Sequence, residues 1–145
     1  MIARILIIED DSASRELVKY LFDAAGYDTL DAEDGSLGLR LALEANPDLV
    51  VCDLQMPVMN GYDVIRHLHA HPVWHRVPII AVTAFSMEGD RETALSAGFD
   101  EHITKPITPE TFVGQVEVFL PPELRVRHPL TSTDGGIDCG KDTGR

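Results

Sequence analysis

The sequence predicts an α/β fold in which five β-strands and five α-helices alternate to form a doubly wound parallel sheet. Short apolar runs of strand length alternate with segments of helical periodicity from residue 4 to about residue 120. Several of these runs are apolar throughout, which is typical of parallel strands that are buried on both faces. Strict alternation also favours right-handed crossovers, which place helices on both sides of the sheet.

The first two β-α units are expected at residues 4–8, 12–25, 27–32 and 36–45. The first strand is a continuous apolar run, whereas the second contains fewer apolar residues and is expected to be an outer strand. Ser12 or Ser14 is expected to cap the first helix, because a hydroxyl there accepts a bond from a free backbone N–H. Gly26 ends this helix, and apolar residues three or four positions apart give both helices a buried face.

The third and fourth units are expected at residues 49–52, 61–70, 78–82 and 86–97. Both strands are apolar throughout, so we expect them to be buried on both faces. Asp53 follows the first of these strands and Thr83 follows the second. The helix after Thr83 has few large apolar residues and an internal Gly89, and is therefore expected to be the loosest helix.

The last unit is expected at residues 99–104 and 109–120, and a change of composition follows it. Thr108 is expected to cap the helix, and the proline pair at 121–122 to end it. Beyond this pair the periodicity disappears, and the chain becomes rich in Gly, Thr, Ser and Asp. We therefore expect one domain at residues 1–122 and a flexible polar tail or linker stub at residues 123–145.

The composition restricts the class of protein. The 145 residues carry a formal net charge of -12, which disfavours nucleic acid and anionic membranes as partners. No apolar run approaches the length of a membrane span, and no signal-peptide pattern opens the chain. Cys52 lies in an expected buried strand and Cys139 in the polar tail, so we expect no disulfide. A reducing cytoplasm is the expected location.

Polar side chains follow four of the five expected strands. They are, in chain order, Glu9 with Asp10, then Asp53, Thr83 and Lys105. In an open parallel sheet, ligands bind beyond the carboxyl ends of the strands. The sequence therefore predicts that a carboxylate cluster, a hydroxyl and an ammonium group meet at one edge of the sheet.

In this order and at these strand ends, the motifs resemble the receiver domain of two-component response regulators. The residues that carry the resemblance are Glu9-Asp10, Asp53, Thr83-Ala84 and Lys105-Pro106. It covers about residues 3–120 and implies a flavodoxin-like strand order of 2-1-3-4-5. Residues 81–87 with Gly89-Asp90 also resemble stand-alone receivers that regulate bacterial cell-cycle and polarity kinases.

The resemblance implies that Asp53 is a phosphoacceptor. A carboxylate can attack phosphorus and form an acyl phosphate. Because both reacting groups are negative, a divalent cation has to bridge them, and Mg²⁺, which Mn²⁺ can replace, prefers oxygen ligands. As the resemblance implies, Asp10 and Asp53 offer one oxygen each, the backbone carbonyl of Gln55 a third, and Glu9 acts through a bound water. Repulsion within this cluster is expected to raise at least one carboxylate pKa.

The resemblance also implies roles for Lys105 and Thr83. Lys105 is expected to pair with Asp53 in the empty site and with the phosphoryl group in the filled one, and the Thr83 hydroxyl to donate to a second phosphoryl oxygen. It further implies a cis bond before Pro106. His102 stands where the family usually carries a Tyr or Phe that swings inward, and a histidine is smaller and titratable. We therefore expect the switch to be weaker, or spread over the Thr83 loop and the fourth helix.

The predicted function is that of a single-domain response regulator. It takes a phosphoryl group from a sensor histidine kinase or a histidine phosphotransfer protein, and it catalyses its own phosphorylation and slow autodephosphorylation. Phosphorylation is expected to switch a surface on the fourth helix, fifth strand and fifth helix that binds a downstream protein.

Other readings of the same residues remain open. A haloacid-dehalogenase-like phosphatase requires a second Asp at the position of Gln55, and a flavodoxin-like cofactor binder requires a glycine-rich phosphate loop in place of Glu9-Asp10-Asp11. An interaction domain with an unused acid pocket is the third alternative, since Asp10 and Asp11 can simply cap a helix. The histidines at 67, 69, 71 and 75 can hold a metal, but a solvated helix end is the preferred interpretation.

Overall fold

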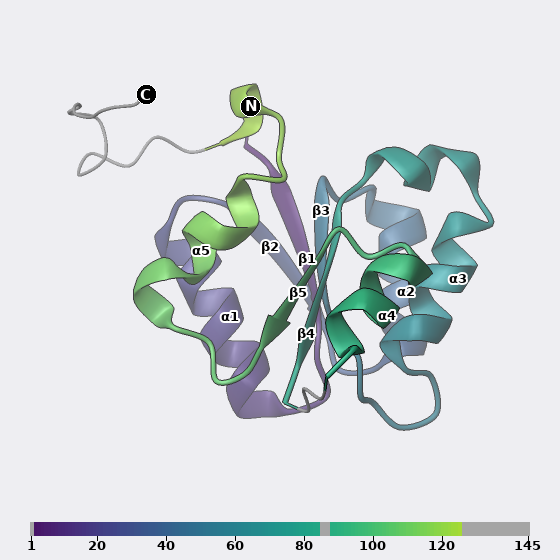
Figure 1. Ribbon diagram of the computed structural model, residues 1–145. Helices are drawn as coiled ribbons and strands as arrows, with labels where there is room; N and C mark the ends of the chain where they lie inside the picture. The colour runs from purple at the N-terminus through teal and green to yellow at the C-terminus, as the bar shows by residue number, and fades with distance from the viewer. Residues whose placement is uncertain (1, 85–87, 126–145) are drawn as a thin grey trace.

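Five parallel strands form one sheet in the order β2-β1-β3-β4-β5, with helices on both faces (Figure 1). The protein is represented by a computed structural model that describes residues 2–84 and 88–125. The strands are β1 (Arg4–Ile8), β2 (Asp28–Ala32), β3 (Leu49–Asp53), β4 (Ile79–Thr83) and β5 (Glu101–Thr104). The helices are α1 (Ser12–Ala24), α2 (Gly35–Ala45), α3 (Gly61–His69), α4 (Asp90–Ala97) and α5 (Pro109–Glu117), with short 3-10 helices η1 (Pro72–Arg76) and η2 (Pro122–Leu124). The predicted fold class and strand order are confirmed.

The core lies on both sides of the sheet because successive strand residues face opposite ways. Ile5 and Ile7 of β1 pack with the aromatic rings of Phe22 and Phe112, on the side covered by α1 and α5 (Figure 1). Alternate residues of the same strand join the second cluster, under α2, α3 and α4. Every residue of β3 and β4 is buried, as expected for central strands. None of the described helices is both long and apolar enough to cross a membrane.

Two helix starts differ from the sequence predictions. Asp11 caps α1 by accepting a bond from the backbone N–H of Ser14 at 2.9 Å, so the alternative of an Asp11 cap holds in place of the expected Ser12 or Ser14. A carboxylate is also favoured there by the helix dipole. Gly89 is the N-cap of α4 and not an internal residue, because its φ of 92° cannot continue a right-handed helix. Residues 86 and 87, predicted to open this helix, lie outside the described residues.

The C-terminal part also departs from prediction in its bounds. The last helix ends at Glu117, before the proline pair, and the following residues form turns through Phe119 N–H to Val116 and Leu120 N–H to Glu117. Leu120 is nevertheless buried. The expected flexible tail falls largely on residues 126–145, which lie outside the described residues.

A close backbone contact brings α3 against the end of β3. A Cβ atom on Gly61 would lie 2.7 Å from the carbonyl oxygen of Asp53, so only glycine allows this approach. Asn60 caps the helix and forms a reciprocal capping box with Asp63. The loop that connects Asp53 to α3 is therefore fixed at both of its ends.

Val58, in this loop, has a strained backbone. Its φ is 71°, in the left-handed region that β-branched residues avoid, and its side chain is fully exposed. We expect Val58→Asn to raise the free energy of unfolding by about 1 kcal/mol, because asparagine tolerates this conformation and no packing is lost. Urea denaturation measures the change.

The matched control is Val73→Asn. Val73 is also exposed, but its φ is not positive. The control should change stability by less than about 0.5 kcal/mol. Equal effects of the two substitutions would show that Val58 stores no backbone strain.

Candidate functional site

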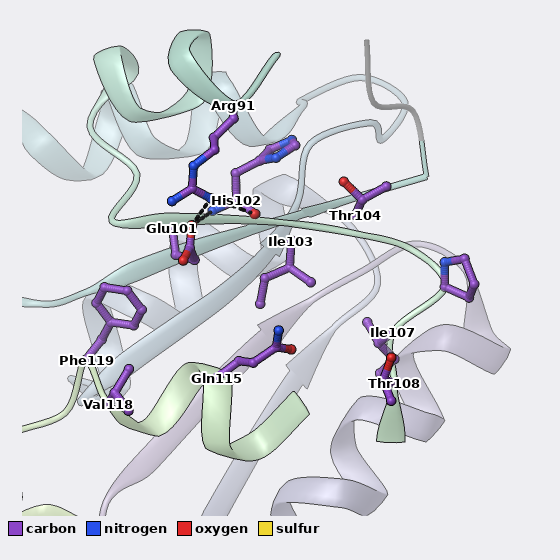
Figure 2. A pocket seen from close by; sticks show the side chains of 11 residues that line it. Arg91, Glu101, His102, Ile103, Thr104, Ile107, Thr108, Gln115, Val118 and Phe119 are labelled. Carbon is purple, nitrogen blue, oxygen red and sulfur yellow. Dashed lines mark hydrogen bonds and ion pairs between the residues drawn. The ribbon is translucent and has the colours of Figure 1, made fainter. Parts of the chain in front are cut away.

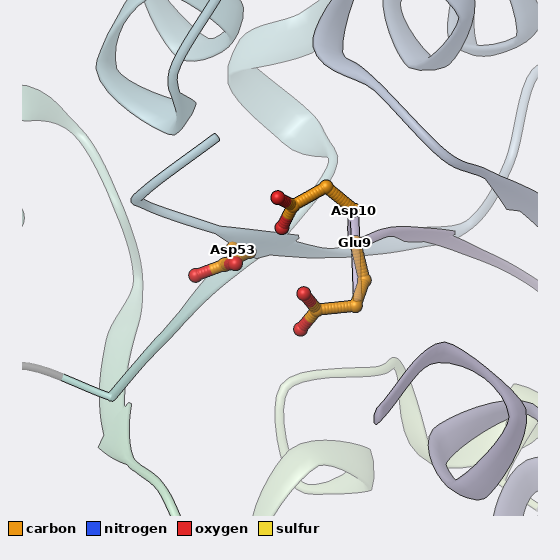
Figure 3. A group of neighbouring side chains, drawn as sticks. All are labelled: Glu9, Asp10 and Asp53. Carbon is orange, nitrogen blue, oxygen red and sulfur yellow. The ribbon is translucent and has the colours of Figure 1, made fainter. Parts of the chain in front are cut away.

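Three carboxylates meet at the carboxyl edge of the sheet (Figure 3). Glu9 and Asp10 follow β1, and Asp53 ends β3. Ile8 pairs with Cys52 in the parallel register, so the residues that follow these two lie side by side. One oxygen from each carboxylate lies within 4.8 Å of the others, and Glu9 and Asp53 are buried while Asp10 is exposed. The predicted acid cluster is thus brought together.

Asp53 is a buried carboxylate in a negative environment. Burial, followed by the hydrogen bond and the charge of Glu9, raises the pKa of Asp53 to about 7. Lys105 and the backbone N–H of Gln55, which donates to Asp53 Oδ1 at 3.3 Å, offset part of this shift. The raised pKa of Asp53 agrees with the expectation from the sequence that at least one carboxylate of the cluster has a raised pKa.

Lys105 reaches into the same cluster from the loop after β5. Its Nζ lies 2.7 Å from Glu9 Oε1 and 3.6 Å from Asp53 Oδ2. The predicted pair with Asp53 is therefore the longer of two contacts, and Glu9 is the nearer partner. Burial by itself would lower the pKa of Lys105, but the hydrogen bond to Glu9 and the neighbouring negative charges raise it. The ammonium group is held in its charged form between the two carboxylates.

The backbone around Lys105 connects it to Thr83. The Lys105 N–H donates to the carbonyl of Thr83 at 2.8 Å, and the Lys105-Pro106 bond is cis, as the resemblance implied. Thr83 is buried at the end of β4, one residue beyond the pairing of Asp53 with Val82. A cleft of about 480 Å³ adjoins Thr83 and reaches Gln55 in the loop after Asp53.

His102 occupies a buried position on β5. Its ring lies on the side of the strand that faces α4 (Figure 2), and its Nε2 has no hydrogen-bond partner among the described residues. Arg91, in the first turn of α4, forms an ion pair with Glu101 and donates to the His102 carbonyl at 3.3 Å. The His102 N–H also donates to Glu101, at 2.8 Å. The sequence did not single out Arg91 or Glu101, because nothing in it shows that α4 begins above this strand.

Within the described residues, the histidines at 67, 69 and 71 do not form a cluster of potential metal ligands. Among the described side chains, Glu9, Asp10 and Asp53 form the one group of three or more potential ligands within 4.8 Å. His67 and His71 are exposed. The His69 ring lies close against Gly98, since a Cβ atom on this glycine would be only 2.6 Å from the ring. The side chain of His75 lies outside the described residues.

The raised pKa of Asp53 has a consequence for stability in the absence of metal. The native state holds the Asp53 proton more tightly than the unfolded chain does, so this stabilisation is complete below about pH 4 and is lost as the pH rises to about 7. Asp53→Asn, which does not titrate, should therefore be more stable than the wild type by about 4 kcal/mol above pH 7, because each unit of raised pKa corresponds to about 1.4 kcal/mol. Near pH 4 this advantage should disappear. Urea denaturation with a chelator between pH 4 and 8 measures the difference, and a difference independent of pH would contradict the assignment.

Comparison with known proteins points to one family. A family model described as a response regulator receiver domain matches residues 5–117. The polar-differentiation response regulator DivK of Brucella ovis is 35% identical over 120 residues, which cover 83% of this chain and 98% of the relative. The DivK protein of Brucella anthropi is also 35% identical, over 80% of this chain and 94% of the relative.

Solved structures show the same fold. The chemotaxis protein CheY4 of Vibrio cholerae superposes with a TM-score of 0.78 and 26% identity, over 83% of this chain and all of that one. The receiver domain of the sensor histidine kinase PA1611 of Pseudomonas aeruginosa, solved with a magnesium ion coordinated in its active site cleft, has a TM-score of 0.74 and 29% identity. That match covers 82% of this chain and 98% of the other.

Proposed function

Because this chain belongs to the response regulator receiver family, we propose that Asp53 accepts a phosphoryl group from a phosphohistidine protein. The observation that supports this most strongly is a buried carboxylate at the end of β3, placed between two further acids and the Lys105 ammonium. Burying a carboxylate destabilises a protein unless a cation balances its charge. Buried carboxylates with perturbed pKa values are therefore concentrated at functional sites. The donor is a sensor histidine kinase or a histidine phosphotransfer protein, and the location is the cytoplasm.

The residues fit a divalent cation. One oxygen from each of the three carboxylates lies within 4.8 Å of the others. Among the described residues, Lys105 is the one cationic side chain that forms ion pairs with this cluster. Oxygen donors of this kind suit Mg²⁺ or Mn²⁺. Asp10, Asp53 and the backbone carbonyl of Gln55 would hold the ion directly, and Glu9 through a water. When bound, the ion neutralises the negative charge that would otherwise keep a phosphoryl group away from Asp53.

The transfer itself requires an ionised Asp53 carboxylate. One of its oxygens forms a bond to phosphorus, and the P–N bond of the donor breaks with its electron pair returning to the imidazole nitrogen. In this proposal, the Lys105 ammonium and the Thr83 hydroxyl donate to phosphoryl oxygens, which stabilises charge in the transition state. Water later attacks the acyl phosphate, which regenerates the carboxylate and releases inorganic phosphate.

A response then has to leave the pocket, and the surface of α4, β5 and α5 is the proposed route. Thr83 lines the same cleft as Asp90, the first residue of α4, and Ala94 is the buried residue of that helix. A groove of about 440 Å³ lies along β5, between Arg91 of α4 and Phe119 beyond α5 (Figure 2). We propose that movement of Thr83 toward the phosphoryl group shifts α4 above His102 and changes this groove, which binds a downstream protein.

Beryllofluoride, a stable mimic of the phosphoryl group, tests this switch. In the wild type, amide NMR shifts should extend from Asp53 through residue 83 and residues 88–105 to α5. Thr83→Ala should permit phosphorylation but reduce the distant shifts, whereas Lys105→Ala should slow phosphorylation as well, because it removes the ammonium that contacts the phosphoryl group. Shifts confined to the pocket in the wild type would mean that the protein stores phosphate without switching.

A further inference from the structure

The turn where the chain leaves β1 is held from three directions. The N–H of Glu9 donates to the Ala32 carbonyl of β2 at 3.0 Å. The carbonyl of Glu9 accepts a bond of 2.9 Å from Arg15 Nη1, which comes from α1. The Glu9 carboxylate accepts a bond of 3.1 Å from the N–H of Asp11. Glu9 is thus fixed at its backbone on both sides and at its side chain.

Arg15 is itself held in place. Its Nε lies 3.2 Å from Asp31 Oδ2 on β2, and its side chain is 17% exposed. A guanidinium group is planar and carries several donors in fixed directions, so bonds to two partners determine its orientation. Arg15 therefore connects α1 and β2 to the backbone carbonyl of Glu9.

We propose that Arg15, oriented by Asp31, is a positioning residue that sets the distance from Glu9 and Asp10 to the Asp53 pocket. The inference rests on the proposed function, because it assigns Arg15 to the cation-binding part of that site. Both carboxylates extend from the segment whose carbonyl Arg15 holds. If this segment moves, Asp10 moves relative to Asp53, and Glu9 moves relative to the Lys105 ammonium that it contacts at 2.7 Å.

The charge of Arg15 makes the proposal easy to test. A positive charge beside an acid cluster opposes the binding of a cation. If Arg15 acted through its charge alone, its removal would tighten Mg²⁺ binding. If it positions the ligands, its removal weakens binding, since groups that orient metal ligands are typically worth about 10- to 100-fold in metal affinity. The two roles therefore predict changes of opposite sign.

Calorimetric titration of the full chain with Mg²⁺ measures the effect. Arg15→Ala should bind Mg²⁺ about tenfold more weakly, and Asp31→Asn should weaken binding about threefold. Arg15→Gln lacks the charge but keeps an amide donor for the Glu9 carbonyl, so it should recover most of the affinity. In the metal-free protein, the amide NMR signals of Asp10 and Asp11 should shift in Arg15→Ala and return toward wild-type positions in Arg15→Gln.

Arg4 provides a matched control at the opposite edge of the same sheet. It pairs with Asp28 at 3.4 Å and donates to the Ala45 carbonyl at 3.0 Å, the same two kinds of contact. Arg4→Ala should leave Mg²⁺ affinity within about twofold of the wild type, because it disturbs no residue near the ligands.

Unchanged or tighter Mg²⁺ binding in Arg15→Ala would overturn the positioning role. If that variant does not fold, Asp31→Asn decides the question, because wild-type affinity and wild-type Asp10 signals in Asp31→Asn contradict the proposal as well. A wild-type protein that binds no Mg²⁺ would overturn the proposed cation site and this inference together. If Mg²⁺ binds normally to the wild type and to Arg4→Ala but more weakly to the Arg15→Ala and Asp31→Asn variants, both the cation site and the positioning role of Arg15 are supported.

Discussion

Asp53→Asn is expected to abolish phosphorylation while leaving the fold intact. The amide is nearly the same size as the carboxylate but has no anionic oxygen to attack phosphorus, so no acyl phosphate forms. Because Asp53 is buried and its removal relieves like-charge repulsion with Glu9, the variant should fold at least as well as the wild type. Labelling by acetyl phosphate or by a phosphorylated histidine kinase, in the presence of Mg²⁺, should fall to background.

Asp28→Asn is the control for this experiment. Asp28 is an exposed aspartate at the far end of the sheet, where it pairs with Arg4. This variant should be labelled like the wild type. Stoichiometric label in Asp53→Asn that is stable to acid and labile to base would identify another residue as the acceptor.

Asp10→Asn is expected to weaken Mg²⁺ binding by about tenfold or more, because it removes one anionic ligand from the cluster. Asp11→Asn is a close control: it removes the same charge one residue away, and asparagine can still cap α1. This control should change the affinity by less than about threefold, the size expected of a screened surface charge. Calorimetry is preferable to the fluorescence of Trp74, which is buried in η1 outside the site.

Equal losses in the Asp10 and Asp11 variants would indicate that general charge, and not direct ligation, determines the affinity. Unchanged binding in Asp10→Asn would move the cation away from Asp10 and contradict the site as proposed.

The strand pattern made most of the fold predictable. Continuous apolar runs such as residues 49–52 identify strands that are buried on both faces, and the rule for open parallel sheets then places the residues after them at one edge. For this reason, one site could be predicted from the residues that follow these strands, namely Glu9, Asp10, Asp53, Thr83 and Lys105. Helix starts were less predictable, because serines near Asp11 are equally plausible caps and because Gly89 is informative only once its φ is known.

The orientation of side chains between elements could not be read from the sequence. Nothing in it indicates that Lys105 lies closer to Glu9 than to Asp53, or that Arg15 spans from α1 to both Glu9 and Asp31. These contacts depend on how far each helix is shifted along the sheet, which periodicity does not specify. The strain at Val58 also depends on the loop path imposed by the close contact of Gly61 with Asp53.

Reductive trapping of the phosphorylated protein tests the central claim most directly. Borohydride reduces an aspartyl phosphate to homoserine with release of phosphate, and it leaves ordinary carboxylates and phosphoesters unchanged. After Mg²⁺-dependent phosphorylation, peptide mass spectrometry should find homoserine in place of Asp53, in proportion to the label incorporated and absent when the phosphodonor is omitted. Homoserine in place of Asp10 or another carboxylate, or full labelling with no homoserine at all, would contradict Asp53 as the phosphoacceptor.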